Sequence, residues 1–213
     1  MTTTERSRPS PAYALILPPG FVLIPTRGDV AATVRAKVRA LYDTLDDRTR
    51  GRLALAERKL AEYATNAGRR GVVDIVLPVS NYWNAPLSIG MGFGPARPDT
   101  DPGGTVVRTR AGSALRSVDE RPKVPEFETA KAPDGSAMGD GRTVWRTVHH
   151  VWKTPDAGAG LLLGTFSVSG DGDPGLAPLA DALTELGDTI MGSLAWTGLD
   201  DAPPAEPVQG GEQ

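Results

Sequence analysis

Two adjoining segments, "TVWRTVHHVWK" (Thr143–Lys153) and "LLLGTFSVS" (Leu161–Ser169), decide the fold class. Both are rich in the β-branched, aromatic and aliphatic residues that favour strands. The stretch that joins them, "TPDAGAG" (154–160), contains the Pro and Gly residues typical of a turn. Consecutive strands with a short connection pair antiparallel, so the two segments predict an antiparallel sheet.

Further strand-like segments precede this pair. They are "FVLIP" (Phe21–Pro25), Gly71–Ser80, Pro86–Gly94 and a hairpin over Thr105–Arg121 whose turn is expected near residues 111–113. The stretch from Pro122 to Arg142 is polar and rich in Pro and Gly, and it is therefore expected to be a loop.

Apolar residues at helical spacing predict three helices. The first has its stripe at Val30, Val34, Val38 and Leu41. The second starts at the capping pair Thr44 and Asp47, ends at a left-handed Gly68, and has its stripe at Leu53, Ala56, Leu60, Tyr63 and Ala67. The third begins near Pro178, and its stripe is Leu179, Leu183, Leu186, Ile190 and Leu194. Gly187 and Gly192 should each weaken this helix by about 1 kcal/mol relative to Ala.

The order of elements, a strand, two helices, five or six strands and a helix, predicts an α+β fold. We expect one mostly antiparallel, meandering sheet of about six or seven strands, with the two helices of the N-terminal half and the C-terminal helix packed on it. Trp196 should cover the end of this sheet. The 213 residues fit a single domain at 12–197, between polar tails at 1–11 and 198–213 that we expect to be disordered.

Composition excludes several classes of protein. The chain has no cysteine, and so no disulfide, thiol nucleophile or thiolate metal site. No apolar run approaches the roughly 18 residues needed to span a bilayer. The apolar stretch Ala12–Pro25 is interrupted by "PPG" and lacks the order of a signal peptide. We therefore expect no membrane span and a cytoplasmic location.

Charge is distributed unevenly along the chain. Residues 27–70 contain eleven Arg/Lys and six Asp/Glu, a net of +5, whereas residues 154–213 contain ten acids and no base, a net of −10. This asymmetry could steer a partner, or it could describe two solvated faces that attract each other. Because no recognised motif and no basic–aromatic interleaving accompany the basic stretch, we expect no nucleic-acid binding.

The two histidines, His149 and His150, are adjacent in an expected strand. Successive side chains of a strand point to opposite faces, so these two cannot bind one metal ion together while the strand stays regular. One should face the helices and the other solvent, and Trp145 should share a face with His149, as Trp152 does with His150. No orienting acid or nucleophile is identifiable for either histidine, and we expect plain strand residues, no metal and no cofactor.

Two glycine-containing stretches approach known binding motifs without matching them. "GMGFG" (Gly90–Gly94) lacks the last glycine of a dinucleotide-binding loop, and a proline-rich segment follows it instead of a helix. Glycines at alternate strand positions more often mark a bend or bulge. "SGDGDPG" (Ser169–Gly175) lacks the distal Glu of a calcium loop and is better explained as a turn before the last helix.

The residues expected to form an interaction surface come from the basic helices and from one connection between strands. Tyr82 and Trp83 lie in "SNYWNAP" (Ser80–Pro86), where aromatic residues serve either in binding or as a lid over the core. The basic helices supply Arg35, Arg39 and Arg52, which complete the candidate surface.

Segments at both ends resemble an uncharacterised actinobacterial family. Near the start the matching residues are Pro18-Pro19-Gly20-Phe21, Leu23, Ile24 and Pro25, then Gly71-Val72-Val73-Asp74. Near the end they are Leu162, Leu163, Thr165, Phe166, Leu186, Asp188, Ile190 and Trp196. The resemblance implies a PsbP-like α+β fold and an association with type VII secretion genes, but no catalytic residues. The chain departs from the family at "PARPDTDPGG" (95–104), where the family has a helix.

Three functional hypotheses remain. The first is a non-enzymatic protein-interaction module, an accessory to type VII secretion or to another actinobacterial assembly. The second is a protein that binds a small ligand or lipid in a pocket between the sheet and the terminal helix. The third is an enzyme that uses His149 or His150. The partner and the oligomeric state are not predicted.

Overall fold

A computed structural model describes residues 12–42, 47–78, 85–96, 103–123, 143–155, 160–170 and 174–197. Its strands are β1 (Ala12–Ala14), β2 (Phe21–Pro25), β3 (Asp74–Pro78), β4 (Leu87–Ala96), β5 (Thr105–Thr109), β6 (Gly112–Lys123), β7 (Thr143–Lys153), β8 (Leu161–Gly170) and β9 (Ala195–Thr197). Its helices are α1 (Val30–Tyr42), α2 (Asp47–Arg69) and α3 (Ala177–Gly192), with a short 3-10 turn, η1 (Pro174–Leu176), before α3.

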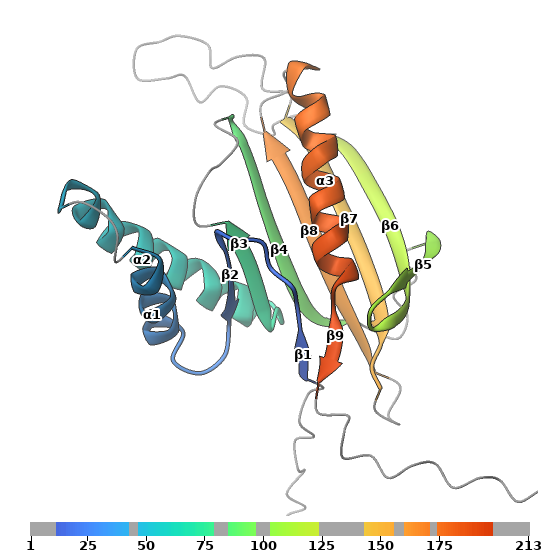
Figure 1. Ribbon diagram of the computed structural model, residues 1–213, viewed down its shortest axis with the longest axis horizontal. Helices are drawn as coiled ribbons and strands as arrows, with labels where there is room; N and C mark the ends of the chain where they lie inside the picture. The colour runs from blue at the N-terminus through green and yellow to red at the C-terminus, as the bar shows by residue number, and fades with distance from the viewer. Residues whose placement is uncertain are drawn as a thin grey trace, which may run out of the picture.

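Seven of these strands form one antiparallel sheet in the order β2-β3-β4-β8-β7-β6-β5, and β1 pairs with β9 in a small second sheet. The α+β fold class is thereby confirmed (Figure 1). The strands follow one another from β2 to β4 and from β5 to β8. Between these two runs the chain crosses from the middle of the sheet to its edge, because β4 pairs with β8 and not with β5.

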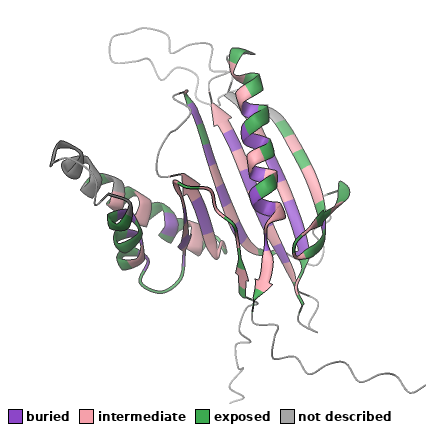
Figure 2. Cartoon of the chain, viewed as in Figure 1, coloured by how far each residue is buried: buried purple, intermediate pink, exposed green. Residues whose placement is uncertain are grey.

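The helices cover opposite faces of the sheet. The α1–α2 pair packs against β2 and β3, where Ile24 and Ile75 meet the valines of α1. The other face contains the larger core, in which β4, β7 and β8 pack against α3. Strand β2 contributes to both, with Val22 and Ile24 in the first core and Phe21 and Leu23 beside the second. Figure 2 shows the buried residues concentrated on the strands behind α3 and beside α2.

Helix α1 buries the stripe that its sequence predicts, since Val30, Val34 and Val38 are all at most 8% exposed. The expected stripe of α2 is wrong at Tyr63, which is 56% exposed, while its neighbour Ala64 is fully buried. The buried side of α2 is made by small residues, including Ala64 and Gly68. A Cβ on Gly68 would lie 2.8 Å from the carbonyl oxygen of Thr26, so the backbones approach closely at that point.

The expected left-handed end of α2 at Gly68 is also wrong. The helix continues to Arg69, and the left-handed conformation belongs to Gly71, with φ of 90°. Gly68 is needed for the close approach to Thr26, whereas Gly71 turns the chain toward β3.

The hairpin of β5 and β6 is longer than its sequence suggests. Its turn lies at residues 110–111, and β6 extends through Pro122 and Lys123, which were expected to begin a loop. Pairing with β7 explains the extension, because the register runs to Lys123 opposite Thr143. The remainder of the expected loop, residues 124–142, and both expected tails lie outside the described residues.

The two ends of the domain meet in the small β1–β9 sheet, which the sequence did not predict. Tyr13 is opposite Trp196, and their rings make an edge-to-face contact with centroids 6.4 Å apart. Trp196 packs, half-buried, against the main core, as expected of its position after α3. Through the pairing of β9 with β1, the chain beyond α3 contacts the segment that precedes β2.

Candidate functional site

His149 and His150 lie on opposite faces of β7, as the strand geometry predicts. His149 is half-buried on the face away from α3, with its Nδ1 3.1 Å from Oγ1 of Thr165. Burial lowers the pKa of His149, partly offset by the negative charge of Asp119. His150 is 2% exposed and lies under α3. The two rings therefore cannot converge on one metal ion.

His150 is buried beside both polar and aromatic side chains. Its Nε2 is 3.6 Å from Oδ1 of Asp188, and its ring stacks on Trp152 with centroids 5.5 Å apart. Burial lowers the pKa of His150 to about 4, with Asp188 opposing the shift and Arg116 and His149 adding to it. The ring is thus neutral at pH 7. Its Nδ1 is buried and has no hydrogen-bond partner among the described residues.

Asp188 of α3 is held mainly by Arg116 of β6. The Nε of Arg116 donates to Oδ1 at 2.8 Å and its Nη2 donates to Oδ2 at 2.6 Å, a two-point contact that fixes both side chains. Hydrogen bonding to Asp188 raises the pKa of Arg116 despite partial burial. The carboxylate is therefore already paired on both oxygens when it faces His150.

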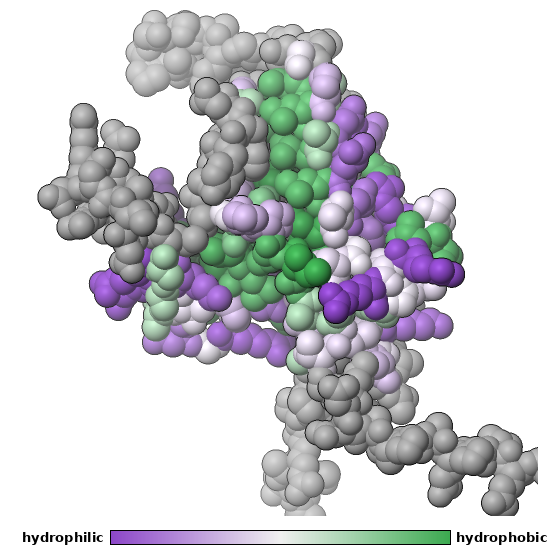
Figure 3. All heavy atoms as spheres, viewed as in Figure 1, coloured by the Kyte–Doolittle hydropathy of each residue, from purple (hydrophilic) through white to green (hydrophobic). Residues whose placement is uncertain are grey.

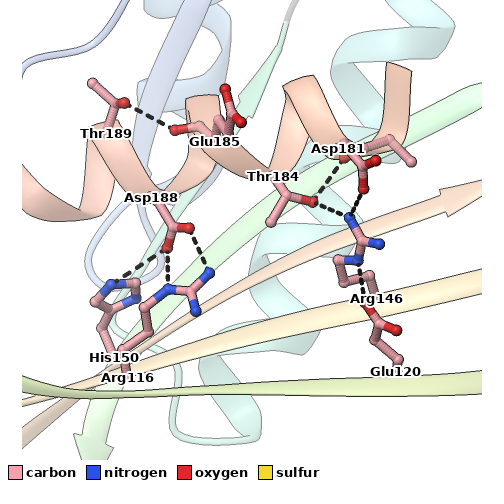
Figure 4. Close-up of polar contacts among 10 residues, drawn as sticks. Arg116, Glu120, Arg146, His150, Asp181, Thr184, Glu185, Asp188 and Thr189 are labelled. Carbon is pink, nitrogen blue, oxygen red and sulfur yellow. Dashed lines mark hydrogen bonds and ion pairs between the residues drawn. The ribbon is translucent and has the colours of Figure 1, made fainter. Parts of the chain in front are cut away.

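A second charged cluster lies nearer the start of α3. Nη1 of Arg146 on β7 donates to Asp181 at 2.6 Å and to the hydroxyl of Thr184 at 3.2 Å. Nε of Arg146 is 2.9 Å from Glu120 on β6, an ion pair without hydrogen-bond alignment. The hydrogen bond to Asp181 is the main cause that raises the pKa of Arg146. Figure 4 shows both clusters along one side of α3.

Together the two clusters fix the position of α3 along the sheet. Asp181 and Asp188 are seven residues apart, about two helical turns, so both carboxylates project from the same side of the helix. Each meets an arginine from a different strand. Both acids lie off the apolar stripe of Leu179, Leu183, Leu186 and Ile190, which by itself does not identify a partner for either. Their partners, Arg116 and Arg146, could have been identified only through the pairing of β6 with β7.

The contact directly beneath α3 is filled by side chains. A Cβ on Gly187 would lie 2.6 Å from the ring of Phe166, so the helix rests on that ring. A Cβ on Gly164 of β8 would meet Trp152 at 2.9 Å and Met191 at 3.0 Å. At these two positions α3 and β8 are in direct contact with the core side chains.

The other side of α3 is apolar. Half-buried hydrophobic residues of α3, of β2 and of the segment between β1 and β2 pack against the core there: Leu15, Leu17, Phe21, Leu23, Leu179 and Leu186. Figure 3 shows a hydrophobic strip along this side of α3 and hydrophilic residues along the side of the ion pairs. One helix thus separates a charged seam from an apolar strip.

The candidate interaction residues are only partly placed. Arg35 and Arg39 are exposed on α1, one turn apart, away from the buried valines. Arg52 lies within α2, and its side chain is outside the described part of the structure. Tyr82 and Trp83 also lie outside the described residues. The structure therefore does not test whether the aromatic pair and the arginines share a surface.

The motif-like glycines belong to regular structure. Gly90, Gly92 and Gly94 lie within β4, where a Cβ on Gly94 would approach the carbonyl oxygen of Gly71 to 2.9 Å. They serve close packing in a strand. Asp171 and Asp173 of the second motif lie outside the described residues. Among the residues that the structure describes, no three His, Asp or Glu side chains gather as metal ligands would.

No helix in the described part of the chain is both long and apolar enough to cross a membrane. Comparison of the chain with protein-family models, with curated proteins and with solved structures found no significant match. The resemblance to the actinobacterial family accordingly stays an expectation from the sequence.

Proposed function

We propose that this chain is a non-enzymatic protein-interaction module that binds an acidic partner surface through α1. The observation that carries the proposal is the charge of this helix. Arg35, Lys37 and Arg39 are all exposed, and α1 contains no acidic residue. Among the side chains of α1 that the structure describes, three valines are buried and most of the others are exposed (Figure 2).

The paired charges around α3 support a non-enzymatic role. Asp188 and Asp181 are each paired with an arginine, and His150 is only 2% exposed. A general acid or base must come within hydrogen-bond reach of the atom it serves. The ion pairs instead join α3 to β6 and β7, on the face of the sheet opposite the α1–α2 pair.

The resemblance to a secretion-linked actinobacterial family suggests the kind of assembly involved. In this proposal the chain is an accessory to type VII secretion, or to another actinobacterial assembly, and α1 contacts an acidic surface of a component. Opposite surface potentials would accelerate association and make it sensitive to salt.

Affinity capture with matched charge reversals tests the proposal. The wild type, Arg39→Glu and Lys153→Glu would each be used as bait, since Lys153 is an exposed base at the end of β7. We expect one partner to be recovered with the wild type and with Lys153→Glu but lost with Arg39→Glu. Equal recovery by both variants, or recovery that does not weaken with salt, would contradict a role for α1.

A second candidate function is the binding of an apolar ligand, which the apolar strip beside α3 favours (Figure 3). Because α3 rests directly on Phe166 at Gly187, we place such a ligand along the strip beside the helix. Titration with a fatty acid, followed by tryptophan fluorescence, would detect it. Leu186→Asp should abolish saturable binding, whereas Leu55→Asp, at a leucine that is 47% exposed on α2, should leave it unchanged.

A further inference from the structure

Strand β5 ends the seven-stranded sheet, and no other described strand pairs with its outer edge. An edge of this kind presents backbone N–H and C=O groups that can pair with another strand. The edge is also held in place. It is hydrogen-bonded to β6 along its length, and N–H of Arg110, just after it, donates to the carbonyl oxygen of Gly192 at 2.9 Å.

The side chains of this edge are unusually apolar for a solvated strand. Val106 is 70% exposed, and its cross-strand neighbour Leu115 is 36% exposed. Soluble proteins commonly protect an edge with proline, lysine or a covering segment. Strand β5 has no proline, and its one charged residue is Arg108. The opposite edge of the sheet differs, because β2 ends in Pro25 and α1 packs beside it.

The sequence of β5, "TVVRT" (Thr105–Thr109), has a valine at its centre and a threonine at each end. Two copies aligned antiparallel about Val107 would place Thr105 opposite Thr109, Val107 opposite itself, and Val106 opposite Arg108. Pairs of β-branched residues and of threonines stabilise such ladders. The aliphatic stem of Arg108 can cover the exposed Val106 while its charged end stays in water.

We propose that β5 pairs antiparallel with β5 of a second copy of this chain, so that the two sheets become one continuous sheet. The dimer would be weak and dependent on concentration, because five residues from each copy form less than the standard interface of roughly 1,600 Å². It uses the end of the sheet farthest from β2 and α1 and does not depend on the proposed function of α1.

A single introduced cysteine tests the register, since the chain has none of its own. Residue 107 lies on the two-fold axis, where directly opposite Cβ atoms are about 4.5–5.5 Å apart, close to what a disulfide needs. Val107→Cys should therefore form a disulfide dimer under mild oxidation. Thr105→Cys is the matched control, because the two copies of residue 105 would be about 13 Å apart, four residues along the strand. Equal rates of cross-linking, or none for Val107→Cys in folded protein, would overturn the proposal.

Sedimentation equilibrium of the cysteine-free protein gives an independent measurement, needed because Val107 is half-buried and its substitution could disturb folding. The wild type should dimerise reversibly, and Val106→Asp should raise the dimer dissociation constant about tenfold or more. Leu55→Asp introduces the same charge at a leucine that is 47% exposed on α2, away from β5 and β6, and should leave the constant unchanged. A wild type that stays monomeric at every concentration, or equal effects of both substitutions, would show that β5 does not pair.

Discussion

Arg116 on β6 and Asp188 on α3 form a two-point contact, with one carboxylate oxygen 2.8 Å from Nε and the other 2.6 Å from Nη2. The same carboxylate lies 3.6 Å from the buried His150. Asp188 thus joins the terminal helix to two strands. Several consequences for stability can be measured at this contact and around it.

Removing one partner of this contact should destabilise the domain. Arg116→Met leaves Asp188 without its cation beside a neutral imidazole, and we expect a loss of about 1–3 kcal/mol, less than for a fully buried pair because both side chains are more than a quarter exposed. Urea unfolding of Arg116→Met, Asp188→Asn and the double variant would give the coupling energy. Additive effects of the two substitutions would contradict a direct contact. Lys153→Met, at an exposed base, serves as the control.

Gly187 should be required by packing, although it lies in a helix. Alanine has the higher helix propensity by about 1 kcal/mol. Its Cβ would nevertheless lie 2.6 Å from the ring of Phe166, and overpacking of this kind costs about 1–3 kcal/mol. Gly187→Ala should therefore lower the unfolding midpoint.

Gly192 provides the matched control in the same helix. A Cβ there would meet no atom within 4 Å, and its φ is not positive. Gly192→Ala should leave stability unchanged or increase it by a few tenths of a kcal/mol, because it is the last residue of α3. If both alanine variants change the midpoint in the same direction, the contact with Phe166 does not decide the effect.

Mild acid should destabilise the protein through His150. The pKa of this histidine falls from its ordinary 6.5 to about 4 in the folded state, because burial disfavours the charged ring. Between these values the unfolded chain binds the proton more readily, so stability present at pH 7 is lost as the pH falls from about 6.5 to about 4. The loss approaches about 3 kcal/mol.

Urea midpoints measured from pH 7.5 to pH 4 would test this dependence. His150→Gln should flatten the profile, whereas His149→Gln should change it less, since His149 is only half-buried. If the urea midpoint of His150→Gln falls with pH as steeply as that of the wild type, other groups cause the acid sensitivity.

Trp196 should contribute to stability through the closing β1–β9 sheet. Its ring is half-buried against Tyr13, so Trp196→Ala should cost about 1–3 kcal/mol, below the roughly 3–5 kcal/mol of a fully buried tryptophan. Tyr13→Phe provides a comparison, because it keeps the ring and removes only the hydroxyl that donates to Asp74 at 2.6 Å. A neutral Trp196→Ala that abolishes partner capture would instead make Trp196 a binding residue.

Much of the fold is determined by local patterns in the sequence. The apolar spacing of Val30, Val34 and Val38 fixes the buried side of α1, and the alternation in Thr143–Lys153 places His149 and His150 on opposite faces. Short connections between consecutive strands determine the antiparallel pairing of β5 with β6 and of β7 with β8. These features depend on residues a few positions apart, where the helix and strand periods act directly.

The tertiary structure alone decided which distant residues meet. Arg116 and Asp188 are 72 residues apart in the chain, and nothing in either local pattern selects the other. The same holds for the pairing of β4 with β8, for β1 with β9, and for the contact of Gly68 with Thr26. Strand order and helix position bring such groups together, and a pattern of 2 or 3.6 residues carries no information about partners that far along the chain. The local sequence therefore determined most of the helices and strands, the packing of the sheet against α3 determined the charged seam, and the strand order placed β5 at the end of the described sheet.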